Sequence, residues 1–215
     1  MTAAGDVLAL DASVGGASVA LLRDGAVLGE ATLPRQGAAE GLAPAVDALL
    51  REGGVRVSAL QAIVVGMGPG SFTGVRVAAA LANGLSHGSG VPVRLVSSLA
   101  LVVAGAGLPA GRYVAVGDAL RGDWFVQRCD VDAAGAVTVV GARELARAEA
   151  VRAQAAAEGR VVVGPPIDGL QLPHARGAAR LASVAAPAGW EPDYGRLAEA
   201  QVQWEAAHGR PLPTA

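Results

Sequence analysis

Apolar runs of strand length alternate with short polar turns at the start of the chain. Residues 7–10, 17–22 and 26–33 form three such runs, and Asp24-Gly25 separates the last two. An Asp-Gly pair between two strand-like runs is a strong signal for a β-hairpin. The pattern therefore predicts three strands, of which the second and third form a hairpin.

The next segment changes from strand spacing to helix spacing. Leu42, Val46, Leu49 and Leu50 fall on one face of an α-helix. Pro44 is compatible with this helix if it lies in the first turn, where its missing N–H is not needed. We therefore expect an amphipathic helix in this segment.

A second block of strand and helix signals surrounds a glycine-rich loop. Residues 62–66 have the composition of a buried strand and lead into the loop at residues 66–74. The helix that follows has an apolar face of mostly small residues, namely Val75, Ala78, Ala79, Ala82 and Leu85. A strand at 91–96 precedes a short third helix, which is capped by Ser97 or Ser98 and ends at Gly105 and Gly107.

The same succession of elements restarts after a break near residues 108–111. The predicted elements are strands at 113–116, 124–131 and 137–140, a helix at 144–157, a strand at 161–164, and helical segments near 177–186 and 197–208. This order is typical of the ribonuclease-H-like unit that actin, Hsp70 and sugar kinases (the ASKHA proteins) contain twice. We therefore predict an α/β fold of two lobes, residues 1–108 and 109–215, with the second smaller and degenerate.

Composition narrows the classes of function. The chain has 215 residues, 52% hydrophobic and 17% charged, and its net charge of −2 gives no overall basic field for nucleic acid. No apolar stretch reaches the roughly 20 residues of a membrane span, and no signal-peptide pattern is present. We expect a cytoplasmic protein that does not enter a membrane. Cys129 is the only cysteine and is expected to be a buried, inert thiol.

Several residue types needed for catalysis are missing or badly placed. The chain has no lysine, which excludes a P-loop lysine and Schiff-base chemistry. No Asp or Glu lies between Glu52 and Asp118, so the glycine loop has no carboxylate nearby in sequence. The three histidines lack the spacing of metal ligands, and no serine lies in a GxSxG elbow. We therefore predict no catalytic residues and no metal site.

Two segments are candidates for a remnant of a phosphate- or nucleotide-binding site. The first is the turn with Asp11 and Ser13, and the second is the glycine loop with Gly68, Gly70, Ser71 and Thr73. Glycines let the backbone approach an anion, and the loop opens onto a helix N-terminus that favours negative charge. The same residues also suit a turn former and a tight strand-to-helix connection. The sequence leaves both interpretations open.

Three sequence strings resemble the TsaB (YeaZ) family. They are LALDAS at residues 8–13, SVALL at 18–22 and, above all, GPGSFTGVR at 68–76. The resemblance implies a non-catalytic dimerisation subunit that supports TsaD, which transfers a threonylcarbamoyl group to the adenosine beside the anticodon of tRNA. It also implies TsaE as a further partner, a homodimer when the chain is isolated, only indirect contact with tRNA, and ATP or ADP only in the assembled complex.

The resemblance also predicts where subunits meet. TsaB-like chains pair through the two helices of the first lobe, and small side chains allow a neighbouring helix to approach closely. The candidate interface residues are Leu42, Val46, Leu49, Leu50, Val75, Ala78, Ala79 and Ala82. The alternative functions are an autonomous ATPase or small-molecule kinase of the actin superfamily and, with no nucleophile to support it, a peptidase.

Overall fold

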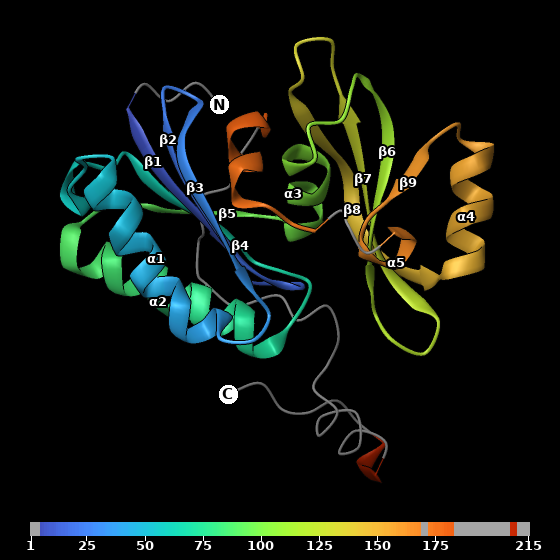
Figure 1. The fold of residues 1–215 in the computed structure, drawn as a ribbon. Coiled ribbons are helices and arrows are strands. Elements are labelled where there is room, and N and C mark those ends of the chain that lie inside the picture. The colour runs from blue at the N-terminus through green and yellow to red at the C-terminus, as the bar shows by residue number, and fades with distance from the viewer. Residues whose placement is uncertain (1–4, 169–171, 183–206, 210–215) are drawn as a thin grey trace.

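A computed structural model describes residues 5–168, 172–182 and 207–209 (Figure 1). The first sheet has five strands in the order β3-β2-β1-β4-β5. Its strands are β1 (Asp6–Asp11), β2 (Gly16–Arg23), β3 (Ala26–Pro34), β4 (Ala62–Gly66) and β5 (Val93–Val96). β2 and β3 pair antiparallel, and Asp24 and Gly25 both have positive φ, as a tight hairpin turn requires. The predicted hairpin is confirmed.

Two long helices cover one face of the first sheet. They are α1 (Ala38–Glu52) and α2 (Phe72–Ser89), and Figure 1 shows both on the side that faces away from the second sheet. Pro44 does not lie in the first turn of α1, where a helix tolerates proline most easily. The helix already begins after Gly37, and Pro44 lies in its second turn. Its missing N–H would have paired with the carbonyl of Glu40, an exposed residue that water can reach.

The second sheet has four strands in the order β8-β7-β6-β9. Its strands are β6 (Gly111–Asp118), β7 (Asp123–Val131), β8 (Val137–Arg147) and β9 (Val161–Val163), and the helices beside it are α4 (Ala148–Ala157) and α5 (Pro165–Asp168). The predicted helix start at residue 144 is wrong because β8 continues to Arg147. Residues 144–147 complete the ladder with β7, and that pairing prevails over their helix propensity.

The remaining elements lie between or beside the sheets. They are η1 (Val57–Ala59), α3 (Ser98–Gly105), which is capped by Ser97, and η2 (Ala175–Arg180). The helix predicted at 177–186 is wrong over residues 177–182, because the chain forms a short 3-10 helix there that ends at Arg180, and residues 183–186 lie outside the described residues. The helix predicted at 197–208 lies outside the described residues except for its last two positions.

Three hydrophobic clusters hold these layers together. One lies between α1, α2 and the first sheet, and another lies between α4 and the second sheet. The third is continuous across both sheets and contains nearly all of α3 together with residues of η2. Because η2 contacts the first sheet as well as α3, a division of the chain near residue 108 stays a prediction.

The structure thus confirms an α/β fold with two sheets of related order. In each sheet an antiparallel three-strand meander is followed by a parallel strand that pairs with the first strand of the meander. Among the described residues, no helix is long and apolar enough to cross a membrane.

Candidate functional site

The glycine loop connects β4 to α2 and packs directly on the turn between β1 and β2. The N–H of Ser71 donates to the carbonyl oxygen of Ser13 at 2.6 Å. A Cβ on Gly70 would lie 2.2 Å from that same oxygen, and one on Gly74 would lie 1.9 Å from the carbonyl oxygen of Ala12. Both distances are far below contact range. The loop is therefore glycine-rich because two backbones touch here.

Asp11 ends β1 and is almost completely buried, with 2% of its surface exposed. Its Oδ1 accepts hydrogen bonds from the N–H and the hydroxyl of Ser13, at 2.9 and 2.7 Å. Its Oδ2 accepts one from the hydroxyl of Ser98. Burial raises the pKa of the Asp11 carboxyl above its usual value, while the hydrogen bonds from Ser98 and Ser13 lower that pKa in part.

Ser98 connects Asp11 to the glycine loop. The oxygen that donates to Asp11 also accepts the N–H of Gly68 at 3.0 Å. Gly66 also lies against Asp11, since a Cβ at that position would be 1.8 Å from Oδ2. One buried carboxylate therefore joins the ends of β1 and β4 to the first turn of α3.

This bonding leaves few groups for a phosphate or a metal ion. The N–H groups of Gly68, Ser71 and Gly74 donate to Ser98, to Ser13 and to the Ser71 hydroxyl that caps α2. A phosphate cradle needs such N–H groups to be directed at the ligand. Within the described part of the chain, no group of three or more His, Cys, Asp or Glu side chains could hold a metal ion. Three N–H groups of the loop are therefore already used within the chain, and the described residues contain no cluster of metal ligands.

A cleft of about 990 Å³ lies next to the glycine loop, and residues of both lobes line it. Its charged lining residues are Arg35 from the first lobe and Asp118 and Arg121 from the second, and Thr73 lies on its wall. The Asp118 carboxylate accepts the N–H of Leu120 at 2.7 Å, which is the bond of a local turn. Asp118 therefore acts as a turn former.

All eight candidate interface residues are buried inside the chain itself. They lie under α1 and α2, with at most 7% of any residue exposed. These side chains hold the helices on their sheet and are not available to a partner. An interface through α1 and α2 stays a prediction, and its contacts would come from exposed residues such as Ala48, Ala80 and Gly84.

The lone cysteine agrees with its sequence prediction. Cys129 is fully buried in β7, and burial, aided by Asp130, raises its pKa to about 12. The thiolate is therefore suppressed at neutral pH, and the prediction of an inert thiol is supported.

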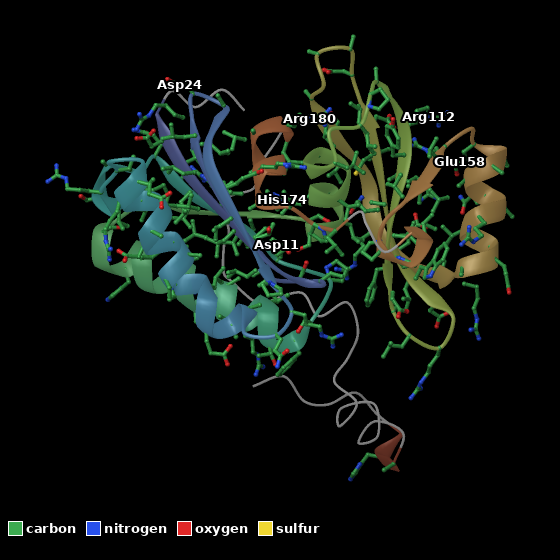
Figure 2. The ribbon with its side chains drawn as sticks, in the orientation of Figure 1. Asp11, Asp24, Arg112, Glu158, His174 and Arg180 are labelled. Atoms are coloured by element: carbon green, nitrogen blue, oxygen red, sulfur yellow. The ribbon has the colours of Figure 1, made fainter. Side chains whose placement is uncertain are left out.

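Sequence reasoning missed a second cluster near Asp11. Figure 2 shows Asp11 and His174 close to one another between the two sheets. Nε2 of His174 lies 3.9 Å from a carboxylate oxygen of Glu30, and Arg176 also binds Glu30 at 3.2 Å. Burial and the charge of Arg176 lower the pKa of His174. The signal in the sequence was Glu30, the one charged residue of a mostly apolar strand.

Fold and site together define a protein of the two-lobed actin, Hsp70 and sugar-kinase class in which the glycine loop is hydrogen-bonded to the β1–β2 turn and to α3. Residues 34–164 match the family model described as "TsaD: tRNA N6-adenosine threonylcarbamoyltransferase". The solved structure of YeaZ from Pseudomonas aeruginosa is 31% identical with a TM-score of 0.66, covering 80% of this chain and 88% of that one. The chain belongs to the TsaB (YeaZ) family.

Curated relatives agree with this assignment. The tRNA threonylcarbamoyladenosine biosynthesis protein TsaB of Haemophilus influenzae is 40% identical, over 43% of this chain and 39% of its own length. The Escherichia coli protein of the same name is 35% identical, over 55% of this chain and 52% of its own length. The chain therefore spans about half or less of these relatives.

Proposed function

We propose that this chain is the non-catalytic scaffold subunit of bacterial tRNA threonylcarbamoyladenosine (t6A) modification. In this role it pairs with a TsaD-type threonylcarbamoyltransferase and supports transfer to the adenosine beside the anticodon. TsaE joins as a further partner, tRNA is contacted only indirectly, and the complex works in the cytoplasm. Membership of the TsaB family supports this proposal.

The observation that carries it is the internal use of several polar groups of the loop that would hold phosphates in a catalytic relative. Asp11 accepts three hydrogen bonds from Ser13 and Ser98, and the N–H groups of Gly68 and Ser71 are used within the chain. A phosphate could not use these groups without breaking that buried network. The chain is therefore proposed to need no cofactor of its own.

The outer surface of α1 and α2 supports pairing with another helical surface. Its exposed positions include the small residues Ala43, Ala48, Ala80, Gly84 and Gly88, next to charged residues such as Asp47 and Arg76. Small side chains let two helices pack at short interaxial distance. Pairing two such surfaces would create a four-helix contact between this chain and TsaD, or between two copies of this chain. The homodimer and the heterodimer would then compete for one surface.

The test uses Ala48→Arg and Ala80→Arg, two substitutions at exposed positions that should not disturb the fold. Each places a long charged side chain in the proposed contact, so binding to the cognate TsaD-type protein should weaken at least about tenfold. Modification of tRNA by the mixture should fall in parallel. Ala156→Arg, at an exposed position of α4, is the matched control and should leave both measurements unchanged.

Two results would contradict the proposal. One is unaltered binding and modification with both arginine variants, which would place the partner elsewhere. The other is ATP turnover by the isolated chain that Thr73→Ala reduces, because Thr73 is exposed on the cleft wall and not needed for the Asp11 network. That second result would favour the autonomous ATPase.

A further inference from the structure

The chain returns to the first lobe after completing the second sheet. Residues 173–182, here called the clamp, contain η2 and run between the two sheets. Figure 1 shows η2 (orange) between the first sheet and α3. The clamp contacts β1, β2 and β3 of the first sheet and α3. It lies about 70 residues after α3, yet it fills the space between the lobes.

The first half of the clamp is hydrogen-bonded to the first lobe. The N–H of Ala175 donates to the buried hydroxyl of Ser18 in β2 at 2.9 Å. The guanidinium of Arg176 binds Glu30 of β3 at 3.2 Å and the carbonyl oxygen of Gly105, at the end of α3, at 2.8 Å. One residue thus ties the edge of the first sheet to the central helix.

The second half of the clamp is hydrogen-bonded to the second sheet, to the connection that leads into it and to α3. Arg180 donates to the carbonyl oxygens of Gly135 at 2.7 Å, Leu108 at 2.9 Å and Ala104 at 3.2 Å. These three acceptors belong to the turn before β8, to the connection before β6 and to α3. The N–H of Ala182 donates to the carbonyl oxygen of Val137 in β8 at 2.9 Å.

Packing reinforces the hydrogen bonds. Ala175, Ala178 and Leu181 are at most 2% exposed and belong to the cluster that is continuous across both sheets. A Cβ on Gly177 would lie 2.6 Å from the backbone nitrogen of Gly105, so the clamp and α3 touch through their backbones. Close-packed interiors resist continuous deformation, and sliding one lobe past the other would disrupt this contact.

We propose that the clamp fixes the two lobes at one separation, so that the cleft does not open and close. Two-lobed proteins that close on ligands do so by rotation about a hinge of a few residues or by small sliding of packed helices. Here a rotation of the lobes must break the bonds of Arg176 and Arg180 and open a shared core. This inference concerns the isolated chain and does not depend on the proposed function.

Spin labels on the two lobes test the clamp. The full chain with Val27→Cys on β3 and Ala156→Cys on α4 carries both labels at exposed positions outside the proposed pairing surface of α1 and α2, while buried Cys129 stays unlabelled. An excess of unlabelled chain removes distances between subunits. Pulsed dipolar spectroscopy should give one narrow distance distribution. Arg180→Ala removes three hydrogen bonds and should broaden that distribution roughly twofold or shift its maximum. Arg180→Lys, which keeps the charge but loses the planar fork, should have a smaller effect in the same direction.

Arg112→Ala is the matched control. Figure 2 shows Arg112 on the second sheet, where its guanidinium donates to the carbonyl oxygen of Glu158 within the same lobe. The Arg112→Ala chain loses an arginine hydrogen bond but keeps every contact of the clamp. Its distance distribution should therefore equal that of the unsubstituted chain. The proposal is wrong if the unsubstituted chain already gives a broad distance distribution. It is equally wrong if folded Arg180→Ala and Arg180→Lys chains both keep the narrow one.

Discussion

The glycine loop and the second half of α2 contain the same residue in opposite surroundings. A Cβ on Gly66, Gly70 or Gly74 would lie 1.8 to 2.2 Å from an oxygen atom of the β1–β2 region. A Cβ on Gly84 or Gly88, one to two dozen residues later, would meet no atom within 4 Å. The first group of glycines joins two strands and a helix. The second group lies on the surface of α2, where no other part of the chain contacts it.

This difference shows that glycine content alone does not identify a phosphate loop. In the loop, the absent side chain allows the buried Asp11 carboxylate and two carbonyl groups to approach the backbone. On α2, the absent side chain lowers helix propensity and brings no contact within the chain. Glycines that lower helix stability without making contacts are consistent with the proposed pairing surface of α1 and α2, where a partner helix would supply the missing contacts.

The largest expected effect comes from Gly66→Ala. The new methyl group would overlap Oδ2 of Asp11, which is buried and held by Ser98. Neither group can move without breaking hydrogen bonds, so we expect a loss of about 4 kcal/mol or more in the free energy of unfolding. Urea unfolding of the full chain measures it. A loss below about 1 kcal/mol would mean that Asp11 and Gly66 can move apart easily and that their close contact is not fixed.

A smaller loss is expected for Ser98→Ala. The substitution removes the bond to the Asp11 carboxylate and leaves the N–H of Gly68 without its acceptor, at a cost of about 1–3 kcal/mol. Ser89→Ala is the control because Ser89 also makes one donated and one accepted bond, at the half-buried end of α2. It should cost less because neither partner is charged.

The cost of Ser98→Ala should depend on pH. Burial raises the Asp11 pKa above 3.8, so the folded state holds this proton more tightly than the unfolded state. The stability that protonated Asp11 contributes is therefore fully present below pH 3.8 and is lost as the pH rises through the pKa of the folded state. The Ser98 bond favours the charged form, so its removal should cost more at neutral pH than near about pH 4. If Ser98→Ala costs the same free energy at both pH values, the hydrogen bond from Ser98 does not favour the charged form of Asp11.

The smallest expected effect is a gain. Gly84→Ala adds a methyl group that points into open space in the middle of α2. Because alanine favours the helix, the free energy of unfolding should rise by about 0.5–1 kcal/mol. Thermal unfolding measured by circular dichroism is sufficient. A destabilised Gly84→Ala chain would remove the contrast with the loop.

Local pattern was sufficient for most of the fold. The hairpin at Asp24-Gly25, the amphipathic spacing from Leu42 to Leu50 and the strand before the glycine loop each carry a periodicity that a window of a few residues reveals. The start of α4 was predicted too early because residues 144–147 pair with β7, a partner that no local window contains. The GPGSFTGVR string at 68–76 also indicates the family, because its residues are contiguous in the chain.

Only the tertiary structure decided how the candidate site is used. The sequence has no acidic residue between Glu52 and Asp118, yet folding brings Asp11 against Gly66 and Ser98, 55 and 87 positions away. It likewise brings Arg176 to Glu30 across 146 positions. Sequence periodicity determines which face of an element is buried, because that depends on neighbouring residues. Which distant group meets a buried carboxylate depends on how sheets and helices pack, and that geometry is decided only when the whole chain folds.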